Sequence, residues 1–413
     1  MVCCVTYFCK FAKNQYQMSD TSSSGIYIHI PFCRRKCIYC DFYSVGERCA
    51  DWGRFADAVI AEARERVEAV RPDGSYTLYI GGGTPSLMPA GELRRIVRSV
   101  IGIAGKEPGE FTIEVNPDDV TEDMAAAWAD CGINRVSMGV QSLVDSELRF
   151  IGRRHDAAGA RKAFETLRRH FSNISLDLMF GLPYQTLESL QTTLRGFLEM
   201  RPEHVSAYSL MYEERTALTR MRDKGSIEEA PEDISVEMFR MVGDALAGAG
   251  YGQYEISNYS LPGRLSRHNS SYWQGSPYIG LGPGAHSYDG HRLRRANLPD
   301  VRLYLKALKG ENSDGENGDG EKTDEGKTTA WYETETLGDD ELREEMIMTR
   351  LRTREGISLP EFESRFGNVE LGKLLKAAGQ PVSAGLLKLS DGESLSLTRE
   401  GIMVSDEVMT LLF

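Results

Sequence analysis

The sequence predicts an α/β protein built around an incomplete barrel of six parallel strands. From residue 25 onward, short apolar runs alternate with longer segments of helical spacing, which is typical of repeated β–α units. The apolar runs end in glycine-rich or polar residues, where such folds carry their sites. The 413 residues are 41% hydrophobic, enough for two or three domains with cores. A doubly wound open sheet is the alternative, because periodicity alone does not separate the two.

The predicted strands are short and rich in β-branched and aromatic residues, and the segments between them repeat apolar residues every three or four positions. The strands are predicted at Ile26–Ile30, Thr77–Ile80, Phe111–Val115, Arg135–Met138, Ile174–Met179 and His204–Leu210. The helices are predicted at Trp52–Val70, Leu93–Ile103, Thr121–Asp130, Ala157–Phe171, Leu187–Met200 and Glu232–Gly248.

Composition divides the chain into five parts. Residues 1–24 differ in character from the rest of the chain and are expected to be a disordered or non-native extension, and residues 25–250 hold the predicted barrel. Residues 251–308 are rich in Tyr and Gly and are predicted to connect the barrel to the C-terminal part. Residues 309–329 are a low-complexity acidic insertion, expected to be disordered. Residues 330–413 predict helices followed by a hairpin, a winged-helix-like cap domain.

The charge balance excludes some classes of function. The formal net charge is −13, so general binding to a nucleic-acid backbone has no electrostatic support. Seven acids against one lysine within residues 310–326 account for −6 of it, a solvated insertion for which an acidic docking tail is the alternative. No apolar run is long enough to span a membrane, and no secretory signal is visible, so the expected location is the cytoplasm.

Three of the eight cysteines are closely spaced directly after the first predicted strand. Cys33, Cys37 and Cys40 lie on one short loop, and three thiolates in this arrangement can hold three irons of an iron–sulfur cluster. No fourth cysteine is adjacent, which leaves one iron open for a substrate. A zinc site with His29 or Cys49 as its fourth ligand is the alternative.

Polar groups follow the other strands. Gly81–Pro85 follows the second strand, where glycines let a backbone approach an anion, although a tight turn also explains them. Glu114, Gln141 and Asp177 stand at or just past the ends of three successive strands, so all three should face one barrel mouth. Carboxylates accept ribose hydroxyls or an ammonium, and an amide both donates and accepts.

These motifs, in this order, resemble the radical S-adenosylmethionine (SAM) family. The matching segments are the cysteine loop, Gly81–Pro85, Glu114–Pro117, Met138–Ser142 and Asp177–Pro183. Within that family, the chain is most similar to the group that contains oxygen-independent coproporphyrinogen III oxidase and the HemW-type haem chaperones. The resemblance covers nearly all of the chain from Gly25 except the acidic insertion. It implies a partial (β/α)6 barrel, a 4Fe-4S cluster held by Cys33, Cys37 and Cys40, and SAM chelating the open iron.

The resemblance also implies which side chains contact SAM. A surface helix-capping role is the alternative for Arg153. Cleavage of SAM by an electron from the cluster is the chemistry that the family performs. The implied SAM contacts are Tyr27, Tyr39, Gly82, Gly83, Thr84, Glu114, Gln141, Arg153 and Asp177.

Two features favour the chaperone branch of the group. Phe42 stands where the oxidases carry a further cysteine, and His268–Trp273 matches the HNxxYW motif associated with haem in the chaperones. A neutral imidazole can ligate haem iron, so His268 is the leading haem residue, with Tyr272 and Trp273 as flat apolar neighbours. His286 is a weaker candidate for haem or SAM. A histidine simply held in an aromatic loop is the alternative.

The resemblance therefore implies a haem chaperone that binds haem and passes it to acceptor haemoproteins, with those of the respiratory chain as candidates. Coproporphyrinogen III oxidase, which converts propionates to vinyl groups, is the alternative. A chaperone would not need that activity, although SAM cleavage stays open. The expected partners are haem and the acceptors, without nucleic acid or a membrane span, and the chain is expected to be a monomer or a dimer.

Overall fold

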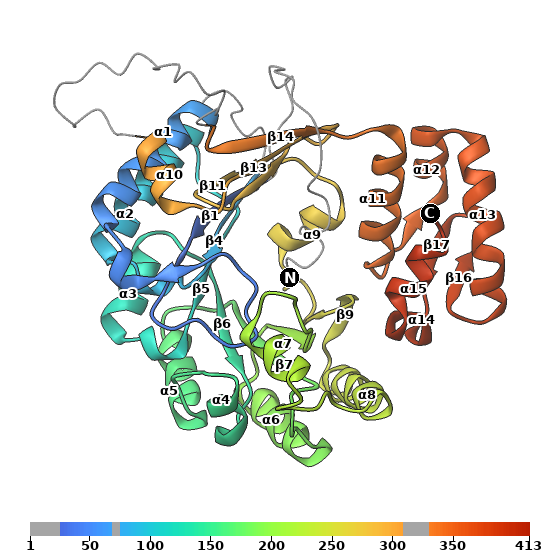
Figure 1. Ribbon diagram of the computed structural model, residues 1–413, viewed down its shortest axis with the longest axis horizontal. Helices are drawn as coiled ribbons and strands as arrows, with labels where there is room; N and C mark the ends of the chain where they lie inside the picture. The colour runs from blue at the N-terminus through green and yellow to red at the C-terminus, as the bar shows by residue number, and fades with distance from the viewer. Residues whose placement is uncertain (1–24, 68–74, 309–329) are drawn as a thin grey trace.

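The computed structural model describes residues 25–67, 75–308 and 330–413. The expectations for residues 1–24 and 309–329 lie outside these described ranges. Within them, one strongly curved sheet forms the larger body, and a smaller helical unit lies beside it (Figure 1). No helix of the described residues is long and apolar enough to cross a membrane.

The six predicted strands are present, parallel and in chain order, and helices alternate with them along the chain. Figure 1 shows most of these helices on the convex side of the sheet, whereas α7 lies against the loop that carries the cysteines. The partial barrel is therefore confirmed. The strands are β1 (Gly25–Ile30), β4 (Thr77–Gly82), β5 (Glu110–Val115), β6 (Arg135–Gln141), β7 (Ile174–Phe180) and β8 (His204–Ser209). The helices are α1 (Trp52–Val67), α2 (Ala90–Ala104), α3 (Glu122–Asp130), α4 (Asp145–Phe150), α5 (Ala157–Arg168), α6 (Leu187–Met200), α7 (Ala217–Asp223) and α8 (Glu232–Gly248).

Residues 251–308, together with β14 at residues 332–336, add strands to both edges of the same sheet. Strand β11 pairs in parallel with β1, and β12, β13 and β14 continue from it as antiparallel strands, whereas β10 and β9 extend the other edge beside β8. The helix α9 (Arg267–Trp273) lies on the concave side of the sheet (Figure 1). The remaining elements of this part are β9 (Gly252–Glu255), β10 (Asn258–Ser260), β11 (Tyr278–Leu281), β12 (His286–Tyr288), β13 (Leu293–Asn297) and α10 (Val301–Ala307). Strand β14 (Tyr332–Thr336) comes from residues 330–413, but it pairs with β13 and so belongs to this sheet.

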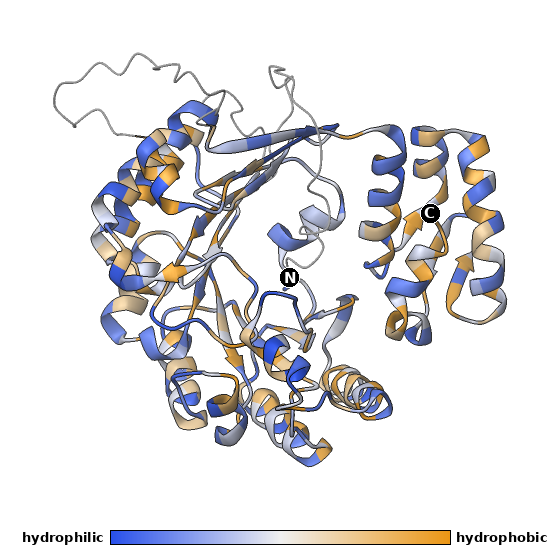
Figure 2. Cartoon of the chain, viewed as in Figure 1, coloured by the Kyte–Doolittle hydropathy of each residue, from blue (hydrophilic) through white to orange (hydrophobic). Residues whose placement is uncertain are grey.

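Alternation along the barrel strands divides apolar from polar side chains. Ile26, Ile28 and Ile30 of β1 are fully buried in the main core, whereas Tyr27 and His29 alternate with them and so face the barrel lumen. The other five strands follow the same rule, with Val, Ile, Leu, Phe and Met in the core. The strands and the helices accordingly both carry hydrophobic and hydrophilic residues (Figure 2). The lumen is therefore lined by polar and aromatic groups.

The C-terminal part has the order helix, strand, two helices and a hairpin, which is a winged-helix arrangement. Its three-stranded sheet, in the order β15-β17-β16, packs with the helices around a core of its own. In the larger body, the loop after β1 forms the short pair β2 (Phe32–Cys33) and β3 (Val45–Gly46). The C-terminal elements are α11 (Asp339–Leu351), β15 (Ile357–Ser358), α12 (Leu359–Phe366), α13 (Asn368–Ser383), β16 (Leu387–Ser390), β17 (Ser394–Leu397), α14 (Arg399–Met403) and α15 (Ser405–Thr410).

Candidate functional site

The three closely spaced cysteines lie at the carboxyl end of β1, on the loop that the β2–β3 pair helps to fold back. Cys33 is buried, whereas Cys37 and Cys40 are partly exposed. The backbone N–H of Cys40 donates to the carbonyl oxygen of Cys37 at 3.3 Å, which makes the second half of the loop a tight turn. Burial raises the pKa of the Cys40 thiol to about 12 and raises that of Cys33 as well.

The donor set fits a cluster better than a single metal ion. In the described part of the chain, no three His, Cys, Asp or Glu side chains are already arranged around one ion position, and this includes the three thiols. The ring of His29 is hydrogen-bonded to the Tyr27 hydroxyl and to the Tyr43 carbonyl oxygen, both at 3.0 Å, and Cys49 is exposed. The fourth ligand that a zinc site would need is therefore not supplied by either predicted residue, and three thiols suit a 4Fe-4S cluster with one open iron.

A chain of hydrogen bonds links two of the thiols through the ends of three other strands. The hydroxyl of Thr84 donates to the Cys33 sulfur at 3.4 Å, and the Asn116 amide donates to that hydroxyl oxygen at 3.3 Å. Arg153 donates to the Asn116 amide oxygen at 2.5 Å, to the carbonyl oxygen of Gly139, and to the Cys37 sulfur at 3.7 Å. The guanidinium lies against the thiols, where it would offset the negative charge of three thiolates. This is no surface-capping residue.

The glycines of the second strand end have close neighbours. A Cβ atom at Gly83 would lie 3.0 Å from the Cys33 sulfur and 2.9 Å from the Phe32 carbonyl oxygen. Gly82 has φ +113°, a backbone conformation that L side chains rarely adopt. Its N–H donates to the Glu114 carboxylate at 3.0 Å. The glycines thus let the segment after β4 pack closely against the thiol loop, as expected if they are needed for close backbone approach.

Two carboxylates face the lumen near these glycines. Glu114 accepts a hydrogen bond from the Tyr79 hydroxyl at 2.8 Å, and Asp177 accepts one from Ser137 at 3.3 Å. Burial raises the pKa of Glu114 to about 7 and that of Asp177 to about 6. These carboxyl groups would be stabilised by a cationic or hydroxyl-bearing ligand, which is what the amino group and ribose of SAM offer.

The remaining predicted SAM residues lie on the same side of the sheet. Gln141 ends β6 at a register shift against β7 and has φ 72°, an uncommon conformation for a residue with a side chain. Its amide nitrogen lies so close to Gly139 that a Cβ there would be 3.1 Å away. Tyr39 packs in a small cluster with Ile38 and Ile151 beside the loop. Burial raises the pKa of its hydroxyl, with the neighbouring Cys37 as a further cause.

The predicted haem motif lies at the opposite end of the barrel. The backbone N–H groups of Arg267 and His268, at the start of α9, donate to the carboxylate of Glu110, the first residue of β5, each at 2.9 Å. His268 is 1% exposed. Its Nδ1 is 2.7 Å from the hydroxyl of Thr77, the first residue of β4, and its Nε2 is 2.8 Å from the Tyr272 hydroxyl.

His268 is therefore fully engaged in this conformation. Its ring stacks on Tyr79 with centroids 5.0 Å apart, and burial lowers its pKa to about 3. Trp273 is buried under the Arg352 guanidinium, 4.8 Å from the ring centroid. His286, on β12, is partly exposed and lies near His29 of β1, and burial with the charge of Arg294 lowers its pKa to about 4. The structure does not bring His286 and His268 together.

Three lumen residues are not among those predicted from the sequence. Asn116 joins Thr84 to Arg153, and Tyr79 holds Glu114. Arg135 is 1% exposed, and its Nε and Nη1 atoms have no hydrogen-bond partner among the described residues. Asn116 stands two residues after Glu114, and Tyr79 and Arg135 alternate with apolar residues on their strands. Strand alternation, applied to whole strands rather than to their ends, would have found Tyr79 and Arg135.

Comparisons with known proteins point to one family. Residues 27–196 match the radical SAM superfamily, and residues 337–404 match the HemN C-terminal domain. The chain is 35% identical over 345 residues to the "Heme chaperone HemW" of Lactococcus lactis, covering 83% of this chain and 85% of that protein. It is 32% identical to the protein of the same name from Bacillus subtilis, covering 92% and 97%.

Two further comparisons cover most of the chain. The mouse "Radical S-adenosyl methionine domain-containing protein 1, mitochondrial" is 31% identical, over 95% of this chain and 88% of its own length. Among solved structures, the radical SAM enzyme coproporphyrinogen III oxidase (HemN) of Escherichia coli superposes with a TM-score of 0.76, covering 96% of this chain and 91% of that one. Its sequence identity is 19%, so this likeness concerns the fold alone.

Proposed function

Because this chain belongs to the HemW family of radical SAM proteins, we propose that it is a haem chaperone that binds haem and transfers it to acceptor haemoproteins. The observation that carries this proposal is the close relation to proteins named heme chaperones over most of both chains. Phe42 supports it from the sequence, since the oxidase branch has a further cysteine at that position. The solved oxidase shares the fold at much lower identity.

We further propose that Cys33, Cys37 and Cys40 hold a 4Fe-4S cluster and that SAM binds at its open iron. When bound, the cluster supplies an electron and SAM supplies a sulfonium that can accept it. The chain's own residues position these groups. Arg153 bonds to the Cys37 thiol, Asn116 fixes Arg153 against Thr84, and the small residues at the end of β4 leave the space that a ligand backbone needs.

Tyr27, Glu114, Gln141 and Asp177 line the lumen side of this site and are proposed to contact the ribose, adenine or amino group of SAM. Tyr27 supports such a role because its hydroxyl is held by His29 at 3.0 Å, with its ring 6.0 Å from that of Tyr79. Haem contact through His268 also stays a prediction. It would require the hydrogen bonds to Thr77 and Tyr272 to break, since both ring nitrogens are engaged.

The acceptors and the compartment belong to this proposal too. Free thiols that hold an iron–sulfur cluster need a reducing compartment, and the five described cysteines are all free. We propose the cytoplasm, with respiratory haemoproteins as acceptors. Cell fractionation tests the compartment, and recovery in another fraction, such as mitochondria, would contradict it.

One preparation tests the chaperone against the oxidase. The protein is reconstituted anaerobically with iron and sulfide, then divided. One half receives reductant, SAM and coproporphyrinogen III, and the other half receives haemin followed by an apo-haemoprotein such as apomyoglobin. The proposal predicts a stoichiometric Soret band, transfer of that band to the acceptor, and no protoporphyrinogen. Sustained formation of protoporphyrinogen would establish the oxidase instead.

A further inference from the structure

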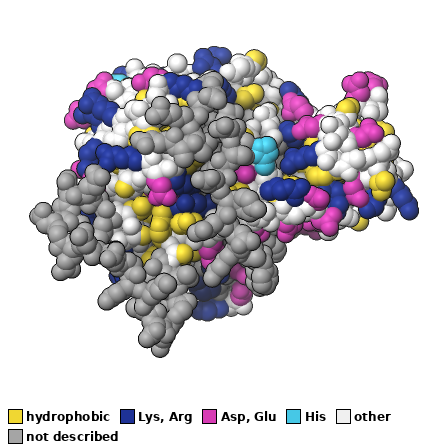
Figure 3. Space-filling model, turned by 90° about the horizontal axis from the view of Figure 1, so that it is seen from above, with side chains coloured by type: hydrophobic (Ala, Val, Ile, Leu, Met, Phe, Trp, Pro, Cys, Tyr) yellow, Lys and Arg dark blue, Asp and Glu magenta, His cyan; other side chains and the backbone are white. Residues whose placement is uncertain are grey.

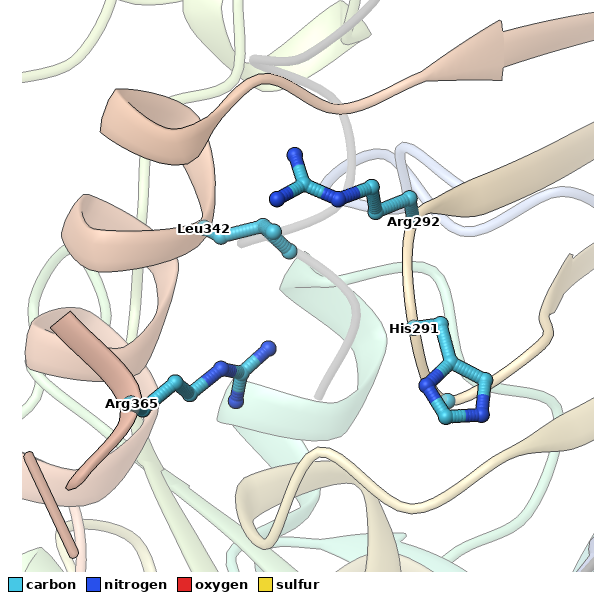
Figure 4. Close-up of a pocket in the computed structure, with 5 residues that line it drawn as sticks. His291, Arg292, Leu342 and Arg365 are labelled. Atoms are coloured by element: carbon cyan, nitrogen blue, oxygen red, sulfur yellow. The ribbon is translucent and has the colours of Figure 1, made fainter.

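An open pocket lies where the larger body meets the C-terminal domain, away from the thiol loop. Its volume is about 380 Å³, and it is lined by Gly290, His291, Arg292, Leu342 and Arg365. His291 and Arg292 come from the turn between β12 and β13, Leu342 from α11 and Arg365 from α12. In Figure 4 the two guanidinium groups extend into the gap between these elements, with Leu342 between them.

The pocket continues toward the helix that carries the haem motif. A smaller neighbouring cavity shares Leu342 and Arg365 with it and is also lined by Gln274 and Gly275, the residues that follow α9. Lys and Arg side chains lie on this face near the junction of the two bodies, interspersed with Asp and Glu (Figure 3). The crevice therefore combines one apolar side chain, Leu342, with basic groups, and Glu345 lines its smaller neighbour.

The histidine of this pocket differs from most of the others in the chain. The rings of His29, His155, His170, His204 and His268 are each hydrogen-bonded to protein groups. The imidazole nitrogens of His286 and His291 have no hydrogen-bond partner among the described residues, and of these two only His291 is exposed. A neutral imidazole with a free nitrogen is what a haem iron binds.

The backbone under His291 is rigid although its ring is free. The Asp289 carboxylate accepts hydrogen bonds from the N–H groups of His291, Arg292 and Leu293 at 2.7, 2.9 and 3.0 Å. The carbonyl oxygen of His291 accepts one from the Tyr288 hydroxyl at 3.0 Å. The turn thus fixes the backbone that carries His291 at the pocket rim, which lowers the entropy lost when the ring ligates iron.

The two arginines are matched to a ligand with carboxylates. Arg292 forms an ion pair with Asp339, whose side chain is 81% exposed, so a ligand carboxylate could replace this weak surface partner. It also donates to the Leu337 carbonyl oxygen at 3.0 Å, which fixes its direction. Arg365 lies over the Phe366 ring, 5.4 Å from its centroid, and is hydrogen-bonded to Tyr288, but it forms no ion pair among the described residues. The nearby Glu345 is already paired with Arg294.

We propose that this pocket is a docking site for haem, with His291 as the iron ligand and Arg292 and Arg365 as the partners of the two propionates. Leu342 would support the apolar face of the macrocycle. The inference rests on the proposed chaperone function and names a site for it that leaves α9 in place. Haem docked here would lie next to the end of α9, so that the sequence motif and the docking site adjoin.

The test is a haemin titration of the full chain, reconstituted with its cluster, followed by the Soret band. The variants are His291→Ala and His268→Ala, and His170→Ala is the matched control because its ring lies on the surface beside Glu122. We expect His291→Ala to weaken haemin binding by about tenfold or more and to shift the Soret band, with His170→Ala unchanged. A wild-type-like titration of His291→Ala would overturn the inference.

A second titration isolates the arginines. Metal-free protoporphyrin IX has the same two propionates but no iron, so His291→Ala should bind it as the wild type does. The double variant Arg292→Leu, Arg365→Leu should bind it several-fold more weakly, and equal binding would overturn the assignment. Absence of haemin binding by the wild type would instead refute the proposed function, so the two failures are distinguishable.

Discussion

Both ends of the barrel lumen are lined by polar and aromatic side chains. They differ in the hydrogen bonds made by the side chains that could bind a metal. At the carboxyl ends of the strands, the thiols receive hydrogen bonds from Thr84 and Arg153, and two of the three remain partly exposed. At the amino ends, His268 has a partner for each ring nitrogen and is buried. The cysteines at one end are thus arranged to bind a cofactor, whereas the histidine at the other end supports the packing of α9 against the barrel.

The largest effect is expected at the thiol loop. Cys37→Ala removes one of the three cluster ligands, and a cluster held by two thiols is expected to be lost on purification. Anaerobic reconstitution should then give a protein without the broad visible absorption of the wild type. Cys49→Ala is the matched control, because that thiol is exposed and outside the loop. If Cys37→Ala absorbed like the wild type, the proposal that the thiol loop holds the cluster would be contradicted.

At the other end, His268→Ala should act on stability. It removes a buried ring, its stacking on Tyr79 and two hydrogen bonds, which together cost about 2–4 kcal/mol in the free energy of unfolding. Urea denaturation measures this loss. His170→Ala, whose ring lies at the surface in an exposed ion pair, should cost less than about 1 kcal/mol. Equal midpoints for the two variants would contradict the supporting role of α9.

The bridge between Thr84 and Arg153 comes next in size. Asn116→Ala removes both of its hydrogen bonds, so the guanidinium is no longer fixed beside the cluster loop, and SAM should bind about tenfold more weakly. Asn116→Asp keeps the acceptor for Arg153 and loses only the donor to Thr84. Calorimetric titration with SAM should place Asn116→Asp between the wild type and Asn116→Ala, and an unchanged affinity in both would contradict the bridging role.

The smallest effect concerns Glu114 and pH. Its pKa is raised from 4.5 to about 7 by burial, so between these values the folded chain holds a proton that the unfolded chain has released. Stability from this group therefore falls as pH rises through that window. Glu114→Gln should remove the dependence and stabilise the SAM-free protein by about 1 kcal/mol at pH 8, a figure reduced for the partial exposure of the side chain. If the free energy of unfolding changed with pH in the same way in Glu114→Gln and in the wild type, the raised pKa of Glu114 would be contradicted.

Local patterns in the sequence are enough to predict the barrel. The six strands and their helices can be predicted because apolar periodicity reflects burial against neighbouring elements. The role of residues 251–308 in extending the sheet at both edges could not be predicted in this way, since pairing between β11 and β1 joins residues far apart in the chain. Sequence spacing carries little information about such long-range pairing.

The candidate site shows the same division. Residues at strand ends are predicted to gather, and Gly82, Thr84, Glu114 and Arg153 do so through bonds to one another or to Asn116. Whether a histidine is free or engaged depends on partners that only the fold supplies. His268 matches a motif, yet Thr77 and Tyr272 hold it, whereas His291 matches no motif and has a free ring.

The central claim is that the thiol loop holds a cluster to which SAM binds, whereas His268 of α9 has a supporting role. Electron paramagnetic resonance of the reconstituted and reduced protein, with and without SAM, tests it directly. SAM should change the cluster spectrum of the wild type and, equally, that of His268→Ala. Cys37→Ala should show no cluster spectrum, with or without SAM. Identical spectra with and without SAM in the wild type, or a SAM response abolished by His268→Ala, would contradict the account.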